Sequence, residues 1–318
     1  MSMNKIVRIG VLGVGKMGQN HLRNLVLLKN VEIVFCYDLD TIALQKCSKL
    51  HEIKASENLE SDLKTVDAII IVTPTFTHCD YIKLASRYVK YIFVEKPLTD
   101  KANTSLEMVQ LSQEKGLYIQ VGFIERYNSA INAMQKVLKQ SKNVINIDFA
   151  RTNKVSSRIT DVDVVIDLMI HDIDLALLLN GRPKKISAHG YVKEGMIEYA
   201  RAIITHENGT FSNLVASRIT EKRIRHIAAT CEDMYIDCNL LSKEVKVNKQ
   251  SLEQYLENVS ISSKEETIDV RPQEALLMEL LDFVTLVRGG EVHAAMVEDG
   301  LAAMEVAHTI QTIILGNQ

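Results

Sequence analysis

The chain has 318 residues, a formal net charge of −3, 47% hydrophobic residues and 24% charged residues. This balance is typical of a folded globular protein, and the length favours two domains over one. The small net charge and the scattered basic residues give no reason to expect nucleic acid or a membrane surface as a partner. No apolar run approaches the roughly 18 residues that a membrane-spanning helix needs.

The cysteines and the N-terminus favour a reduced, cytoplasmic setting. The five cysteines are widely spaced and form no CxxC pair. An odd count with this spacing argues against a disulfide framework or a thiolate zinc site, so no metal is expected. The N-terminal apolar run leads directly into a glycine turn without a cleavage region, which predicts a first strand and not a signal peptide.

The first part of the chain alternates short apolar runs with helical patterns. Apolar strands separated by helices are typical of a parallel sheet covered on both faces, so residues 1–123 are predicted to form a doubly wound Rossmann domain. The expected strands are 6–12, 31–37, 68–73, 91–95 and 117–123, and the expected helices are 16–28, 41–50, 78–88 and 102–115.

After residue 123 the regular alternation of strands and helices ends. The following pattern predicts a second, α+β domain over residues 124–318 with an open, mainly antiparallel sheet. Asn208-Gly209 is a strong hairpin signal. The apolar stripes of this sheet exceed what two closing helices can cover, so we expect a homodimer or homotetramer through it. The expected helices are 128–139, 163–179, 273–288 and 294–314, and the expected strands are 143–151, 185–192, 200–207, 210–218, 224–232 and 234–240.

A glycine-rich motif joins the first strand to the first helix. It comprises Gly13, Val14, Gly15, Lys16, Met17 and Gly18, and matches GxGxxG. Glycines there allow a tight turn and close approach to a pyrophosphate, which the helix N-terminus attracts. Asp38 ends the second strand, twenty residues after Gly18. A carboxylate there can accept hydrogen bonds from an adenosine ribose and would repel a 2′-phosphate, which favours NAD over NADP.

Two further groups of residues follow strands of the first domain. Thr73 ends the strand 68–73 and is followed by Pro74 and His78. Glu95 ends the strand 91–95 and is followed by Lys96. The carboxyl ends of parallel strands face the crevice where ligands bind, so we expect all five near the cofactor. For His78, packing against the next helix is an equal alternative, and Lys96 could instead be an ordinary surface lysine.

The helix 163–179 is apolar except for one line of polar residues. Asp163, Asp167, His171 and Asp174 are spaced by four, four and three residues, which places them on one side of a helix. Asp163 lies near the helix start, where a carboxylate is favoured for capping alone. Asp167 and His171 are candidates for acid–base chemistry, and a buried hydrogen-bonded pair is the alternative.

These motifs together resemble the Gfo/Idh/MocA oxidoreductases, in which a nucleotide-binding domain precedes an α/β domain with an open, mainly antiparallel sheet. The resemblance spans nearly the whole chain and rests on GVGKMG, VTPTFTH, EKP and DxxxHDxD. It implies that His171 accepts a proton, that Asp167 assists one turn earlier, and that Lys96 contacts the substrate near the nicotinamide. Thr73 and Pro74 would border the cofactor, with His78 close by.

A closer resemblance concerns VGFIERYN and IDLMIHDIDLALLLNG, which are similar to the UDP-N-acetylglucosamine 3-dehydrogenases within this family. It implies NAD-dependent oxidation of a sugar hydroxyl to a ketone. Candidates for holding the diphosphate or the sugar are Arg126, Asn128, Arg151 and Arg158, because arginine suits phosphate oxygens. A dehydrogenase for an inositol or free sugar, and a non-catalytic NAD-binding regulator, are the alternatives.

The chain departs from the family pattern at the catalytic helix. Many members have glycines before the DxxxH aspartate and one two residues after it. This chain has Val164, Val165 and Ile166 before it and Met169 after it. We therefore expect a tighter helix and a narrower space above the nicotinamide.

Overall fold

A computed structural model of the chain describes residues 6–154, 162–255 and 258–316. It divides into two compact units. The first comprises the residues up to Ile124 together with Glu274–Met304, and the second comprises Glu125–Gln273 together with the residues from Glu305 onward. None of the helices in the described ranges combines the length and apolar character that a membrane crossing requires.

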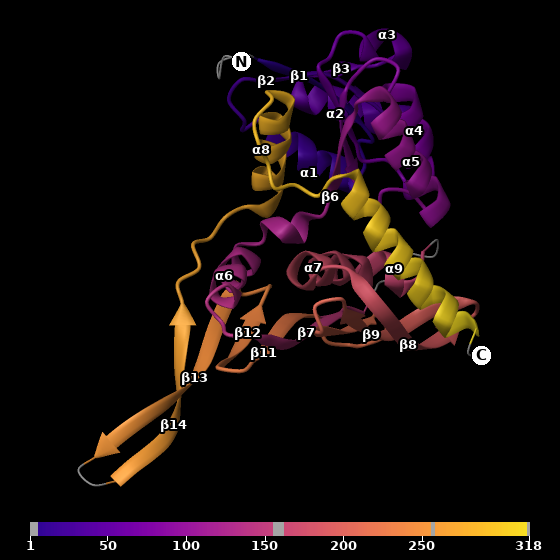
Figure 1. The fold of residues 1–318 in the computed structure, drawn as a ribbon. Helices are drawn as coiled ribbons and strands as arrows, with labels where there is room; N and C mark the ends of the chain where they lie inside the picture. Colours follow the sequence, from indigo (N-terminus) through magenta and orange to yellow (C-terminus); the bar gives the residue numbers. More distant parts are fainter. Residues whose placement is uncertain (1–5, 155–161, 256–257, 317–318) are drawn as a thin grey trace. The chain divides into compact units, whose positions relative to one another are not determined.

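The first unit is a Rossmann-type parallel sheet, as predicted. The described strands lie in the order β3-β2-β1-β4-β5-β6 and every neighbouring pair is parallel. Figure 1 shows α1 and α8 on one side of this sheet and α4 and α5 on the other. The strands are β1 (Val7–Leu12), β2 (Val31–Tyr37), β3 (Lys54–Ala55), β4 (Ala68–Ile71), β5 (Tyr91–Glu95) and β6 (Tyr118–Gly122). The helices are α1 (Lys16–Leu25), α2 (Thr41–His51), α3 (Leu59–Leu63), α4 (His78–Ala85) and α5 (Ala102–Lys115), with a 3₁₀ turn η1 (Thr75–Thr77).

The C-terminal helix α8 (Ala275–Val287) and the start of α9 (Val297–Gly316) belong to this first unit, although the sequence assigned residues 273–318 to the second domain. The physical reason is apolar packing. Phe283 meets Phe93 of β5 edge to face at 5.7 Å between ring centroids. The amide of Val121 also donates to the carbonyl of Ala295 at 2.8 Å. The chain therefore returns to its first core after building the second.

The second unit is a sheet whose eight described strands lie in the order β14-β13-β12-β11-β7-β10-β9-β8. It is antiparallel except between β7 and β10, as the mainly antiparallel prediction requires. Its strands are β7 (Val144–Thr152), β8 (Pro183–Lys193), β9 (Met196–His206), β10 (Phe211–Ser217), β11 (Ile224–Cys231), β12 (Met234–Asn239), β13 (Glu244–Tyr255) and β14 (Asn258–Ile268). Its helical parts are η2 (Ile124–Tyr127), α6 (Ser129–Leu138), η3 (Val165–Met169) and α7 (Ile170–Asn180).

Asn208 and Gly209 form the predicted turn between β9 and β10. Gly209 has a φ of +89°, and the Asn208 side chain accepts a hydrogen bond from the Thr210 amide at 3.0 Å. The hairpin β13–β14 was not predicted. Its sequence is rich in polar residues, and the apolar alternation is confined to Val245 and Val247 in β13 and to Val259 and Ile261 in β14, so the sequence signal is weak.

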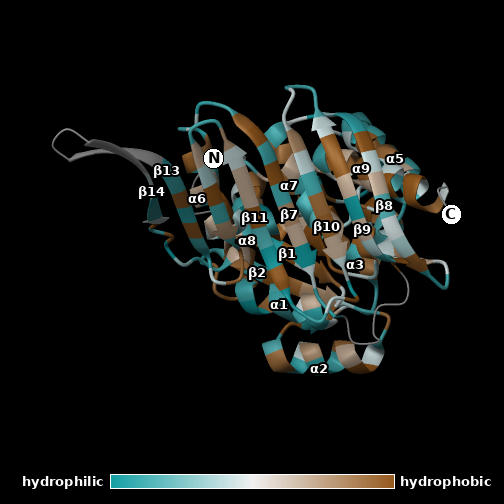
Figure 2. Cartoon of the chain, turned by 90° about the horizontal axis from the view of Figure 1, so that it is seen from below, coloured by the Kyte–Doolittle hydropathy of each residue, from teal (hydrophilic) through white to brown (hydrophobic). Residues whose placement is uncertain are grey.

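Helices cover one face of this sheet, and Figure 1 shows α6 and α7 on the same side of it. Residues such as Phe149 and Leu214 alternate toward that face and are fully buried. Figure 2 shows the alternation of hydrophilic and hydrophobic residues along β7–β11. The opposite face is mixed, because half-exposed Tyr235 and Ile203 accompany the hydrogen-bonded trio Asn146, Asp148 and Asn213. The apolar stripe that was expected to remain uncovered therefore lies largely under helices.

Candidate functional site

The glycine turn after β1 accepts no other residue at two of its three positions. Gly13 has a φ of +92°, and a Cβ added there would lie 2.4 Å from the carbonyl oxygen of Val72. A Cβ on Gly18 would lie 2.1 Å from the carbonyl oxygen of Gly13. Gly15 differs, because a Cβ there would meet no atom within 4 Å. Gly13 and Gly18 thus shape the turn, while Gly15 leaves space above it.

Asp38 holds the end of β2 against this turn. One carboxylate oxygen accepts from the Val14 amide at 2.8 Å and the other accepts from the Asp40 amide at 2.9 Å. Each carboxylate oxygen can accept more than one hydrogen bond, so the group can still bind a ribose diol. Asp38 thus lies beside the glycine turn, and its contact with the ribose stays a prediction.

A hollow of about 390 Å³ lies over the glycine turn within the first unit. Its size, its apolar walls and the glycine floor fit the adenosine diphosphate part of NAD. Burial and the neighbouring Tyr37 raise the pKa of Tyr81, one lining residue, to about 12, so its hydroxyl stays protonated. The lining residues are Gly13, Gly15, Lys16, Met17, Asp38, Leu39, Val72, Thr73, Pro74, Phe76, Thr77 and Tyr81.

The predicted cofactor-binding residues did not include five residues that line this hollow, namely Leu39, Val72, Phe76, Thr77 and Tyr81. Leu39 and Phe76 are 74% and 69% exposed, which is unusual for large apolar side chains and typical of a binding surface. Tyr81 lies on α4 and packs edge to face against Tyr37 at the end of β2. The position of Leu39 next to Asp38, and that of Val72, Phe76 and Thr77 within VTPTFTH, could have indicated four of them.

His78 is buried and lies outside the lining of the hollow. Its Nδ1 is 2.9 Å from the carbonyl oxygen of Pro97 and its Nε2 is 2.9 Å from that of Thr73. Burial lowers the pKa of His78, although both carbonyl contacts favour the protonated ring. The ring therefore joins the segments that follow β4 and β5, which is the packing role that sequence left open.

Lys96 follows β5 in the first unit and is half-buried, with a cis peptide bond to Pro97. The preceding Glu95 directs one carboxylate oxygen to Nε2 of His21 at 2.7 Å. Its other oxygen accepts from the Lys96 amide at 3.2 Å. His21 lies on α1 and is fully buried, so Glu95 is anchored inside the unit. The sequence expectation had placed Glu95 at the cofactor and did not include His21.

The helix that carries Asp167 and His171 begins with a π-helical turn, η3, in the second unit. The amide of Ile170 donates to the carbonyl of Val165, five residues earlier. A π-turn is wider than an α-turn and is often found at functional sites. The expectation of a tighter helix here was wrong, because this turn is π-helical. The narrower space above the nicotinamide stays a prediction.

Asp163 caps this helix, as predicted. One carboxylate oxygen accepts from the amides of Val165 and Ile166 at 3.0 and 3.1 Å. The other accepts from the side-chain amide of Gln311 at 2.8 Å. Asp163 therefore caps the helix start and binds Gln311 near the end of α9.

Asp167 and His171 lie one turn apart at the start of this helix, and both are half-buried. Arg218, at the end of β10, places a guanidinium nitrogen 3.8 Å from the Asp167 carboxylate. The same nitrogen donates to the carbonyl of Val162 at 2.6 Å. Arg218 was not predicted. It holds the helix start to the sheet and places a positive charge beside Asp167.

Arginines expected to bind substrate instead form ion pairs that hold α7 in place. Arg126 donates two hydrogen bonds from Nε and one from Nη2 to Asp174, at 2.6 to 3.1 Å. Arg151, only 3% exposed, binds Asp172 with Nε and Nη2 and Glu125 with Nη1. Burial alone would raise the pKa of Glu125, but the charge and hydrogen bond of Arg151 outweigh it and leave it lowered.

Asn128 also has a structural task. Its side chain caps α6 by accepting from the Ala130 amide at 3.1 Å, and it donates to Glu125 at 3.1 Å. Arg158, the fourth residue expected to bind substrate, lies outside the described residues. The structure thus brings Asp167 and His171 together, and it commits Arg126, Asn128 and Arg151 to contacts within the second unit.

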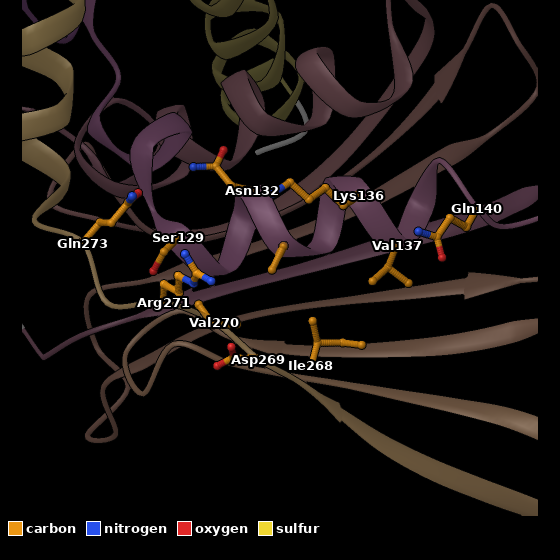
Figure 3. A pocket seen from close by; sticks show the side chains of 11 residues that line it. Ser129, Asn132, Lys136, Val137, Gln140, Ile268, Asp269, Val270, Arg271 and Gln273 are labelled. Carbon is orange, nitrogen blue, oxygen red and sulfur yellow. The ribbon is translucent and has the colours of Figure 1, made fainter.

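A second hollow, of about 630 Å³, lies in the second unit between α6 and the segment that follows β14. Figure 3 shows Ser129, Asn132 and Lys136 on α6, with Gln140 just after it, and residues 268–273 along the other side of the hollow. Its cations, Lys136 and Arg271, are exposed. It contains neither a glycine turn nor an acid–base pair, so the nucleotide hollow and the start of α7 remain the candidate functional parts.

Comparison with known proteins gives matches over most of the chain. The Gfo/Idh/MocA family model described as "Oxidoreductase family, NAD-binding Rossmann fold" matches residues 7–123, and the C-terminal domain model of the same family matches residues 145–236. A UDP-N-acetylglucosamine 3-dehydrogenase of Acidithiobacillus ferrooxidans is 28% identical over 94% of both chains. The scyllo-inositol 2-dehydrogenase (NAD(+)) of Bacillus subtilis is 29% identical over 96% of this chain and 93% of its own.

Solved structures show the same fold. The UDP-N-acetylglucosamine 3-dehydrogenase of Acidithiobacillus ferrooxidans has a TM-score of 0.86 at 26% identity, with 98% of each chain covered. An oxidoreductase of Agrobacterium radiobacter, solved in complex with NAD+, L-tartaric acid and magnesium, has a TM-score of 0.85 at 17% identity, with 99% of this chain and 98% of that chain covered.

Proposed function

Because the chain belongs to the Gfo/Idh/MocA family of NAD-dependent oxidoreductases, we propose that it oxidises a secondary hydroxyl of a UDP-sugar to a ketone. The 3-hydroxyl of UDP-N-acetylglucosamine is the preferred substrate group. The observation that carries this proposal is the likeness to a dehydrogenase of that specificity over 94% of both chains. The acid–base pair at the start of α7 supports the chemistry.

In the proposed reaction His171 takes the hydroxyl proton, since imidazole titrates near neutral pH. Asp167 orients the imidazole or accepts a hydrogen bond from a second sugar hydroxyl, and the Arg218 guanidinium lies 3.8 Å from its carboxylate. Lys96 hydrogen-bonds the reacting oxygen and stabilises the negative charge that develops on it. Bound NAD supplies the hydride acceptor.

A substrate screen tests the proposal. NADH formation is followed with UDP-N-acetylglucosamine, other UDP-sugars, inositols and free hexoses at equal concentrations. We expect turnover only with UDP-sugars, and UDP-N-acetylglucosamine to be the best of them. Turnover of an inositol in preference would favour the second candidate, which the 29% identity to an inositol dehydrogenase supports. NAD binding without turnover of any of these compounds would favour a regulator.

Replacement of the proposed base tests the roles. Because His171 accepts the proton, His171→Ala should lower kcat by about 100-fold or more while NAD still binds. His189→Ala is the matched control, because His189 is exposed on β8 and takes no part in the proposed site. Unchanged kcat in His171→Ala would remove His171 from the mechanism.

We further propose a cytoplasmic homodimer or homotetramer joined through the eight-stranded sheet. The face of this sheet away from α7 carries half-exposed Tyr235, Ile203 and Phe211, which a second copy would bury. The five cysteines are free, which suits a reducing compartment. Light scattering after size-exclusion chromatography should give two or four chain masses, and a single chain mass would reject the assembly.

A further inference from the structure

Two arginines face each other across the centre of the second sheet. Arg151 of β7 and Arg225 of β11 are direct partners in the antiparallel register, so both side chains lie on the same face. Arg151 bonds to Asp172 of α7, so this is the face that α7 covers. Like charges directly opposite each other are unfavourable unless other groups compensate them.

The carboxylates of Asp172 and Glu125 both bind Arg151. Asp172 accepts from Nε at 3.0 Å and from Nη2 at 2.7 Å, and Glu125 accepts from Nη1 at 2.7 Å. All three nitrogens of the Arg151 guanidinium thus have carboxylate partners, and the residue is 3% exposed. Arg151 cannot donate two parallel hydrogen bonds to a ligand without breaking these bonds.

Arg225 is held in a different way. Its Nη1 donates to the carbonyls of Thr152 at 2.9 Å and Ile224 at 2.8 Å, which fixes the guanidinium with neutral groups only. No ion pair joins Arg225 to an acid in the part of the chain that the structure describes. Burial, followed by the nearby charge of Arg151, lowers the pKa of Arg225 to about 10. The charges of Asp172 and Glu125 act in the opposite direction, but neither carboxylate forms an ion pair with Arg225 among the described residues.

The cluster includes the residue that follows the proposed base in sequence. Asp172, which Arg151 holds, is the next residue after His171. Arg225 is half-buried, and its neighbours Lys222 and Arg223 are exposed and add positive charge. A half-buried guanidinium with two nitrogens outside its carbonyl contacts suits two phosphate oxygens.

We propose that Arg225 binds the diphosphate of the UDP-sugar substrate, in place of Arg126 and Arg151. This inference rests on the proposed function and names the residue that makes a nucleotide sugar preferable to a free sugar. A diphosphate supplies the negative charge that Arg225 lacks in the described protein contacts. Arg225 is a binding residue in this scheme and takes no part in proton transfer.

Arg225→Gln tests this, with UDP itself as the probe. Loss of one charge-assisted contact to the diphosphate should weaken UDP binding by about 10- to 100-fold in titration calorimetry. The KM for the UDP-sugar should rise by a similar factor while kcat changes by less than about threefold. The affinity for NAD should stay unchanged. The matched control is Arg201→Gln, because Arg201 is exposed on β9 and lies on the opposite face of the same sheet.

The outcomes separate this inference from the proposed function. UDP affinity and KM that stay at the wild-type values in Arg225→Gln would overturn the role of Arg225 even if wild-type protein oxidises UDP-sugars. Absence of UDP binding and of UDP-sugar turnover in the wild type would overturn both. Should Arg225→Gln not fold, Arg225→Lys keeps the charge without the fork. It should weaken UDP binding by at least about threefold, and wild-type affinity there would also overturn the assignment.

Discussion

Single residues of the nucleotide hollow have separable duties. Gly13 and Gly18 cannot carry a side chain, because the added Cβ would collide with backbone atoms at 2.4 and 2.1 Å. Gly15 has an ordinary extended conformation and open space in front of it. The same residue type therefore serves the fold at two positions and leaves room for the ligand at the third.

Gly15→Ala should weaken NAD binding by about tenfold or more with little change in thermal stability, because the methyl group would occupy space for the pyrophosphate. Gly18→Ala should instead lower the melting temperature, since backbone atoms must move. Calorimetric NAD titration and thermal unfolding measure both effects. Equal losses of stability in the two variants would contradict the division of roles.

Two buried histidines should make stability depend on pH. Burial lowers the pKa of both His78 and His206. In His206, Nδ1 is 2.8 Å from the carbonyl oxygen of Gly181 and Nε2 is 2.9 Å from Oγ of Ser212, which suits a neutral ring. Below an unfolded pKa of about 6.5 the unfolded chain binds more protons than the native one, so stability falls as the pH drops.

The free energy of unfolding should therefore decrease between pH 7.5 and pH 5.5, as measured by urea denaturation at each of these chosen values. At pH 7.5, His206→Gln should have a lower free energy of unfolding than the wild type. Between pH 7.5 and pH 5.5, its free energy of unfolding should fall by less than that of the wild type. His189→Gln, at an exposed position, should follow the wild type. A pH dependence in His206→Gln as steep as in the wild type would exclude His206 as its source.

At the scale of elements, buried ion pairs decide how α7 lies on its sheet. Arg151 links β7 to Asp172 of α7 and to Glu125 of η2, while Arg126 links η2 to Asp174. An apolar helix could slide or rotate on an apolar sheet. The paired charges specify one arrangement of α7 on the sheet. This arrangement fixes the place of His171, which directly precedes Asp172 on the same helix.

Arg151→Met should destabilise the protein by about 3–5 kcal/mol, because it leaves Asp172 and Glu125 buried without their partner. Lys154→Met removes one member of the exposed pair with Glu221 and should cost less than about 1 kcal/mol. Denaturant unfolding compares the two. If the free energy of unfolding falls no more in Arg151→Met than in Lys154→Met, the buried network does not stabilise α7.

At the scale of the whole molecule, the chain leaves its first unit and later returns to it. The core of the Rossmann unit contains Phe283, Leu280 and Leu276 of α8 beside residues of β1, α1 and β5. The nucleotide-binding part is therefore incomplete without a segment that follows the second sheet in sequence.

Phe283→Ala should remove about 3–5 kcal/mol of stability, since it opens a cavity beside Phe93 and so disturbs the NAD-binding unit from the C-terminal part of the chain. Leu281→Ala on the same helix should have an effect of less than about 1 kcal/mol, because Leu281 is 38% exposed. Equal effects, measured by thermal and denaturant unfolding, would show that α8 is not part of this core.

Most of the fold and half of the candidate site could be predicted from local patterns. The apolar strands of the first sheet, the glycine turn, Asp38, the capping role of Asp163 and the turn at Asn208-Gly209 all depend on residues close in sequence. The hairpin β13–β14 and the placement of α8 could not be predicted this way. The hairpin is mostly polar and its hydrophobic alternation is short, and the pattern of α8 does not say which core it completes.

The sequence by itself determined the family, the cofactor class and the residues Lys96, Asp167 and His171 as candidates, because these depend on residue type and short spacing. Only the tertiary structure decided which charged side chains neutralise one another. The sequence predicted Arg126 and Arg151 as phosphate ligands. In the structure, strand register and helix packing pair Arg126 with Asp174 and Arg151 with Asp172. The same register sets Arg225 beside Arg151 without a carboxylate of its own in the described contacts. Burial makes such pairing decisive, since a buried charge requires a partner and distant strands supply it.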